Sequence, residues 1–107
     1  MTQKLQNVLP IGTVILGMRE GISAGNITAT TTAQPIPATA LVDRKTIMIC
    51  NDSGQDAYIG ASDVSTAGTD GFLFKNGEVL CLDLDEVTPL YVVLAGGTGA
   101  IYYVEGS

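Results

Sequence analysis

Hydrophobic and polar residues alternate along much of the chain with a period of two, the pattern typical of β-strands. The alternation is clearest in residues 78–84 (EVLCLDL) and residues 100–105 (AIYYVE). The first segment places Leu80, Leu82 and Leu84 on one face and Val79, Cys81 and Asp83 on the other. The second places Ile101 and Tyr103 opposite Tyr102 and Val104. We therefore expect two strands, each with one face toward a core.

Further strands are predicted where β-branched and aromatic residues stand between turn residues. They are expected at residues 26–36, 45–50, 56–61, 71–74 and 90–96. Residues 45–50 (KTIMIC) form a near-continuous apolar run, which predicts a central strand buried on both faces. Pro35 and Pro37 are expected to end the first of these strands or to place it at a sheet edge. Beyond a short turn in residues 1–9, which Pro10 would end, no helix is predicted.

Turn-forming residues separate the predicted strands. NDSG at residues 51–54 and the pair Asn76-Gly77 have the composition of hairpin loops, and AGGTG at residues 95–99 supplies another reversal. Strands that recur about every 8–14 residues without helical crossovers are typical of antiparallel all-β sandwiches or barrels. We expect an antiparallel β-sandwich of jelly-roll or immunoglobulin-like type, with an extended N-terminal arm.

Residues 1–25 differ from the rest because their apolar residues do not alternate and are interrupted by Gly and Pro. The apolar stretch from Val8 to Met18 is shorter than the about 20 residues that a membrane span needs. A signal peptide is the alternative, since ISAG after this stretch loosely resembles a cleavage site. We expect an arm that ends in a linker (SAGN) and docks on a partner, followed by the β-sandwich domain at residues 26–107. The arm residues expected to contact the partner are Val8, Leu9, Ile11, Val14, Ile15 and Leu16.

Composition excludes several functions. The net charge is −6 and the 107 residues include only five Lys and Arg, which argues against nucleic acid as a direct partner. Histidine is absent, so a Ser-His-Asp or Cys-His site cannot be built from one chain. Charged residues make up 15% of the chain, below the roughly 25% of typical soluble domains. A surface so poor in charge favours oligomerisation or assembly.

The acidic residues are the main candidates for chemistry, because paired carboxylates can serve a glycosidase or bind calcium. They occur in expected loops and in the segment LDLDE, at Asp52, Asp56, Asp63, Asp70, Asp83, Asp85 and Glu86. NDSGQDAY does not supply the EF-hand pattern, and acids at strand ends are usually solvated and discourage edge pairing. We therefore expect no enzyme, catalytic residue, metal or cofactor, and calcium binding stays open as an alternative.

Three other features have structural explanations. No Lys-Ser/Thr follows Gly96–Gly99, so this segment is expected to be a turn and not a phosphate loop. The four tyrosines, Tyr58, Tyr91, Tyr102 and Tyr103, could line a sugar platform but are expected to cap the core. Cys50 and Cys81 are expected to be small buried hydrophobic residues, and whether they pair stays open.

A set of short motifs in residues 27–105 resembles small virion proteins of tailed bacteriophages, of the capsid decoration, cement or head-fibre kind. The matching motifs are Ala38-Thr39-Ala40-Leu41 with Arg44-Lys45, Asn51 after an apolar strand, Tyr58-Ile59-Gly60 with Asp63-Val64, Gly71-Phe72, Gly77-Glu78, Leu80, Leu82-Asp83-Leu84 and Leu90-Tyr91-Val92. They are turn glycines, core apolar residues and a strand-end tyrosine, so they concern the scaffold. The N-terminal arm lies outside the resemblance.

The resemblance implies a structural β-sandwich, made in the host cytoplasm, that sits on the outside of a capsid shell. It implies the major capsid protein as partner, often a homotrimer, and stabilisation of the head by bridging capsid subunits. A tail, neck, baseplate or fibre module of the same fold is an alternative. A carbohydrate- or calcium-binding β-sandwich is the second alternative.

Overall fold

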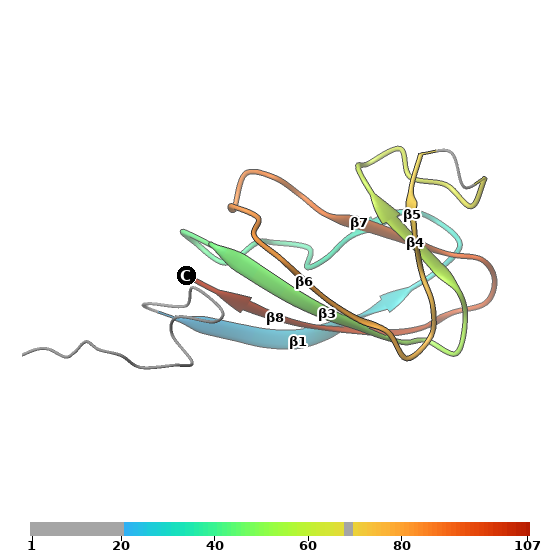
Figure 1. Cartoon of the computed structure of the whole chain (residues 1–107), viewed down its shortest axis with the longest axis horizontal. Helices are drawn as coiled ribbons and strands as arrows, with labels where there is room; N and C mark the ends of the chain where they lie inside the picture. The colour runs from blue at the N-terminus through green and yellow to red at the C-terminus, as the bar shows by residue number, and fades with distance from the viewer. Residues whose placement is uncertain (1–20, 68–69) are drawn as a thin grey trace, which may run out of the picture.

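The structure, a computed structural model, describes residues 21–67 and 70–107, which form two four-stranded sheets (Figure 1). Sheet A has the order β1 (Ile22–Ala29), β8 (Gly99–Gly106), β3 (Thr46–Asp52) and β6 (Val79–Leu82). Sheet B has the order β2 (Gln34–Pro35), β7 (Tyr91–Leu94), β4 (Ala57–Gly60) and β5 (Phe72–Phe74). All neighbouring strands are antiparallel, and these residues contain no helix. The predicted antiparallel all-β class is confirmed for this part of the chain.

One hydrophobic core joins the two sheets. Sheet A contributes Ala29, Ile47, Ile49 and Ile101, and sheet B contributes Ala57, Ile59, Phe74, Val92 and Leu94. Fully burying an aliphatic or Phe side chain of this size stabilises a fold by about 1.5–3 kcal/mol, before the entropy of ordering the chain is counted. The predicted division of residues 78–84 and 100–105 into two faces is confirmed. Leu80, Leu82, Leu84 and Tyr103 pack against the core, whereas Val79 and Tyr102 are exposed.

Most connections cross from one sheet to the other. Among the eight strands described, only β4 and β5 follow one another within a single sheet, and the other six connections cross. The predicted hairpins at residues 51–54 and at Asn76-Gly77 are therefore wrong. Both segments are turns, but β3 and β6 pair with each other in sheet A, while β4 and β5 pair in sheet B. Turn residues determine a local reversal of direction, and the pairing partner is chosen by contacts far along the chain.

The Asn76-Gly77 turn illustrates both the local reversal and the long-range choice of pairing partner. Gly77 has a φ of +89° and the Glu78 amide donates to the Lys75 carbonyl at 3.0 Å, so the local turn is as predicted. The Gly77 amide then donates to the carbonyl of Asn51, and the Asn51 amide donates to the carbonyl of Glu78, at 2.7 and 3.0 Å. These bonds draw the chain after the turn to β3, which places β6 in sheet A.

The first strand begins earlier than predicted. Residues 22–25, assigned above to the arm and its linker, belong to β1 and pair with β8 from Ile22 opposite Gly106 onward. Their small residues resemble a linker, but Gly25 lies opposite Tyr103, and a Cβ at Gly25 would meet the Tyr103 hydroxyl at 2.8 Å. Glycine here leaves room for the aromatic ring. The rest of the predicted arm lies outside the described residues.

Two further strand predictions can be compared with the structure. Pro35 lies in β2, at the edge of sheet B, as its missing amide hydrogen requires. β3 is a central strand of sheet A, also as predicted, but it is not buried on both faces. Ile47 and Ile49 point into the core, whereas Met48 and Cys50, which point outward, are half-buried.

Candidate interaction surface

The outer face of sheet A brings together apolar side chains from all four of its strands. Met48 of β3 lies opposite Val104 of β8 and Cys81 of β6. Cys50, two residues further along β3, lies opposite Tyr102 and Val79 in the same way. Side chains two residues apart share a face, so these residues point away from the core that Ile47 and Ile49 enter.

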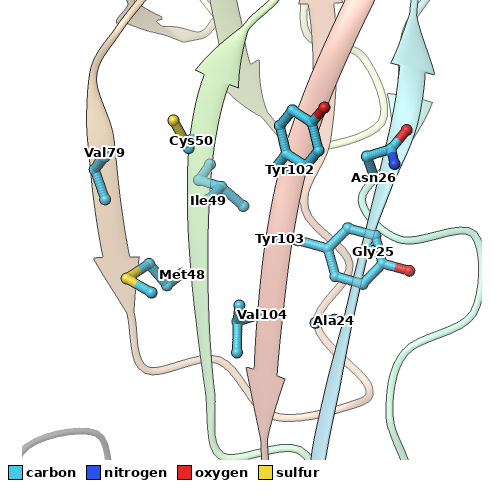
Figure 2. Close-up of a pocket in the computed structure, with 10 residues that line it drawn as sticks. All are labelled: Ala24, Gly25, Asn26, Met48, Ile49, Cys50, Val79, Tyr102, Tyr103 and Val104. Carbon is cyan, nitrogen blue, oxygen red and sulfur yellow. The ribbon is translucent and has the colours of Figure 1, made fainter.

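A groove of about 540 Å³ runs across this face (Figure 2). Gly25, Ile49 and Tyr103 also line it, although the side chains of Ile49 and Tyr103 pack against the core. We call it the sheet A groove. It is lined by Ala24, Gly25, Asn26, Met48, Ile49, Cys50, Val79, Tyr102, Tyr103 and Val104.

The sheet A groove is apolar and carries no charge. None of its lining residues is Asp, Glu, Lys or Arg. Asp52 and Asp83 lie beyond its two ends, since strand alternation puts them on the same face as Cys50 and Cys81. Val79 is 60% exposed and Tyr102 is 46% exposed. Large apolar side chains gathered in an exposed groove are typical of protein interaction sites.

The two cysteines are not both buried, contrary to the prediction. Cys50 is half-buried, Cys81 is exposed, and both are free thiols. They lie on the outer face of sheet A as diagonal neighbours, because Cys50 is opposite Val79 and Cys81 is opposite Met48. Diagonal Cα atoms in a sheet are about 7–8 Å apart, beyond the range of a disulfide without backbone movement. The alternation of EVLCLDL already assigned Cys81 to the face opposite the leucines, and this signal was available from the sequence.

Three of the candidate acidic residues accept hydrogen bonds within or between loops, and the acids of the described residues do not gather into a common site. Asp70 accepts hydrogen bonds from the amide and hydroxyl of Ser65 at 3.0 and 2.9 Å, across the β4–β5 loop. Asp85 accepts from the Thr88 hydroxyl at 2.7 Å, and Glu86 accepts from the Asp43 amide at 2.8 Å. Within residues 21–67 and 70–107, no three acidic or cysteine side chains are placed to hold a metal ion.

NDSG is built around a buried amide. The Asn51 side chain, which is fully buried, donates to the carbonyls of Gln55 and Phe74 at 2.9 and 2.8 Å. Its oxygen accepts from the amide and hydroxyl of Ser53 at 3.0 and 2.6 Å. Every polar atom of the side chain is therefore used, and the amide group joins the end of β3 to the loop before β4 and to the last residue of β5. This segment holds the fold together, and its serine is a turn residue.

A buried ion pair at the opposite end of β3 was not foreseen. Arg44 and Glu105 are each 1% exposed, and Arg44 NH1 lies 2.9 Å from Glu105 Oε2. The guanidinium also donates to the carbonyls of Leu84, Asp85 and Thr88, and Glu105 accepts from the Leu41 amide. Arg44 thereby fixes the β6–β7 loop to the end of β8. Adjacent to Lys45 in the sequence, it resembles an ordinary surface cation, and no local signal distinguishes it.

The four tyrosines are not brought together into one platform. Tyr58 and Tyr91 belong to sheet B, and Tyr102 and Tyr103 lie on opposite faces of β8. Gly96 and Gly97 form the turn between β7 and β8, as the sequence predicted, with Gly97 at a φ of +64°. This turn also crosses between the sheets.

The predicted partner-contacting residues of the arm, Val8 to Leu16, lie outside the described residues, so that prediction stays a prediction. In the part of the chain that the structure describes, no helix of the length and hydropathy of a membrane span occurs. In comparisons with known proteins, neither a family model nor a curated protein matches the chain.

Proposed function

We propose that the domain is a β-sandwich of jelly-roll type. The strand orders β1-β8-β3-β6 and β2-β7-β4-β5, with connections that alternate between the sheets, support this type. An immunoglobulin-like domain has seven strands, or nine in its variable form, and places its first two strands side by side in one sheet. A jelly roll has eight strands in two sheets formed from Greek keys, which agrees with eight strands here.

For function, we propose a structural protein of a tailed-phage virion that decorates the outside of the capsid and bridges major capsid subunits. The observation that carries the proposal is the uncharged, apolar outer face of sheet A on a domain whose buried polar groups are engaged in holding loops. Asn51 and the Arg44–Glu105 pair have internal partners for their polar atoms, so they offer no reactive group to a substrate. The outer face of sheet A offers uncharged, apolar surface to other molecules.

The mechanism in this proposal is burial of apolar surface between subunits. Burying such surface yields about 25 cal/mol per Å², and much of the gain is offset by the loss of rotational and translational freedom. A small decoration protein therefore needs either a large contact or many repeated contacts. The outer face of sheet A and the apolar residues of the arm would together supply this contact, and copies repeated over a shell would multiply it.

The test is to incubate the purified protein with undecorated phage heads and to count bound copies by cryo-electron microscopy. We expect regularly placed density of the two-sheet domain on the outer surface. Density on tails, necks or baseplates with bare heads would favour the alternative virion location. Absence of the protein from purified particles, as judged by mass spectrometry of separated heads and tails, would overturn both virion assignments.

A further inference from the structure

We propose that the sheet A groove is a docking site for the apolar N-terminal segment, Val8–Met18, of a second copy of this chain. Copies of the protein would then be linked by exchanged arms. The proposal concerns self-association in solution, where no capsid competes for the groove and the arm, so it does not depend on the virion assignment.

Charge determines what kind of ligand the groove accepts. Outside the groove, the described surface is acidic, with nine exposed Asp and Glu and two exposed cations, Lys45 and Lys75. An approaching acidic protein is repelled by most of this surface, and a basic one is attracted to its carboxylates, which include Asp52 and Asp83 beyond the ends of the groove. The groove itself has no charged lining residue. It therefore suits an uncharged apolar segment, which loses little hydration free energy of polar groups on entering it.

The chain itself contains such a segment. Residues 5–18 (LQNVLPIGTVILGM) carry no charged side chain, and their apolar residues are concentrated from Val8 onward. The charged residues nearest to this segment, Lys4 and Arg19, lie just outside it. An apolar segment and an apolar groove of this kind each gain from burial, and the match between them is independent of any sequence-specific contact.

Length permits the exchange. Thirteen residue steps separate Val8 from Gly21, and an extended chain of this length spans about 45 Å. β1, which borders the groove, has eight residues and is about 27 Å long. The segment is therefore long enough to lie along the sheet A face. The three residue steps from Met18 to Gly21 span about 10 Å when extended, so the second copy must lie directly beside the first.

The direction of the chain at Gly21 favours a second copy over the same copy. The Ser107 amide donates to the Gly21 carbonyl at 3.1 Å, which continues the β1–β8 ladder beyond the pair Ile22 and Gly106. The chain thus passes Gly21 in the direction of the strand, away from Ala24–Asn26, the residues of β1 that line the groove. Docking on its own groove would require a full reversal within the few residues before Gly21.

The area of the face argues for an arm and against simple stacking of two sheets. Four strands about 4.8 Å apart and about six residues long cover roughly 400 Å². Stable protein interfaces bury about 800 Å² on each partner, so two sheet A faces packed together fall well short. Exchanged arms, each with apolar side chains along eleven residues from Val8 to Met18, add the missing contact.

The half-buried state of Met48 and Cys50 agrees with this arrangement. Their sequence, KTIMIC, has the composition of a strand covered on both faces, yet one chain covers only the face that holds Ile47 and Ile49. A docked arm would cover the second face.

Disulfide trapping tests the proposal, because Cys81 is exposed beside the groove. In the full chain with Cys50→Ser, single cysteines are introduced at Ile11, Val14, Ile15 and Leu16, and each variant is mildly oxidised. We expect disulfide-linked dimers and larger species on non-reducing gels for at least one position. The matched control adds Cys81→Ser, which should abolish these products. A cross-linked product of monomer size would show that the arm covers its own groove, and the absence of any Cys81-dependent product would also overturn the proposal.

Light scattering after size exclusion provides a second test that leaves folding intact. Val79→Glu places a charge in the groove, and Val87→Glu places the same charge at a site that is 80% exposed and is not part of the groove lining. Burying an unpaired carboxylate should weaken self-association by about tenfold or more for Val79→Glu. Val87→Glu should associate like the unchanged chain. Equal association of both variants, with unchanged circular dichroism, would contradict the proposal even if the protein still bound phage heads.

Discussion

The two ends of β3 are held by buried polar side chains of different chemistry. Before the strand, Arg44 gathers three carbonyls of the β6–β7 segment and pairs with Glu105. Near its other end, Asn51 gathers the Gln55 and Phe74 carbonyls with a neutral amide. In a simple antiparallel sheet, a hairpin determines the path of the chain after a strand. Here the two buried side chains determine that path, because they bind the carbonyls of the segments next to β3.

The difference between them lies in the cost of disturbing each end. A buried charge that loses its partner retains a large desolvation penalty, whereas a lost amide leaves only unsatisfied carbonyls. The Arg44 end should therefore be the more sensitive of the two to substitution. At the Asn51 end, replacing the Asn51 side chain should destabilise the fold less than adding a side chain where the backbones of two segments lie in close contact.

The largest effect is expected at Arg44. Arg44→Met leaves Glu105 buried without its partner and should lower the free energy of unfolding by about 3–5 kcal/mol. Lys45→Met, at the exposed neighbouring position, should change it by less than about 0.5 kcal/mol. Urea denaturation of both variants at equal protein concentration measures the difference. If the two variants had similar stability, Arg44 would not be the anchor described here.

The next largest effect is expected where the backbone of β8 approaches Ser53, near the Asn51 end of β3. At Gly99, the start of β8, a Cβ would overlap the carbonyl oxygen and Cα of Ser53, neither of which can rotate away. Gly99→Ala should therefore cost about 3 kcal/mol. In Gly96→Ala, the nearest atom is Oε1 of Gln55 at 3.8 Å, so this control should be nearly neutral. Thermal unfolding of the pair would contradict the close approach of β8 to Ser53 if both melted together.

The side chain of Asn51 should matter less than Arg44. Asn51→Ala leaves the Gln55 and Phe74 carbonyls without their donor and should cost about 2 kcal/mol. Asn51→Asp should not restore stability, because an ionised carboxylate accepts hydrogen bonds but cannot donate to a carbonyl. Asp52→Ala, at the exposed neighbour, is the control and should stay within about 0.5 kcal/mol. Full stability of Asn51→Asp in denaturant titrations would show that donation to these carbonyls is unimportant.

The smallest effect is expected at the turn beside Asn51. Gly77 has a φ of +89° with no atom near its missing side chain, so Gly77→Ala carries only backbone strain. The expected loss is about 1 kcal/mol. Gly77→Asn should lose less, because asparagine enters the left-handed region more readily. The melting temperatures of the two variants should fall in that order, and the reverse order would point to a steric origin.

The sequence predicted the strands better than their pairing. Alternation located β6 and β8 and assigned their faces, because a two-residue period is a local property of the chain. It could not show that β5 and β6 belong to different sheets, since Asn76-Gly77 looks the same in a hairpin and in a crossing turn. The deciding hydrogen bonds come from Asn51, far away in the sequence.

The candidate surface was only partly predictable. The sequence showed that Val79 and Cys81 lie on the face opposite the leucines. It also showed that β3 has apolar residues on both faces. Their meeting on one face required the order of strands in sheet A, which follows from long-range pairing. The burial of Arg44 could not be predicted at all from its neighbours in the sequence, because it depends on carbonyls contributed by a loop about 40 residues later.

The position of β8 has a consequence for how the protein is made. β1 and β3 both precede β8 in the chain, yet β8 lies between them in sheet A. Sheet A therefore cannot be completed until residues 99–106 have been synthesised, and a nascent chain that lacks them can pair β3 with β6 but leaves β1 unpaired. The apolar side chains of β1 and β3 therefore stay exposed until β8 joins them, and during that interval aggregation competes with folding.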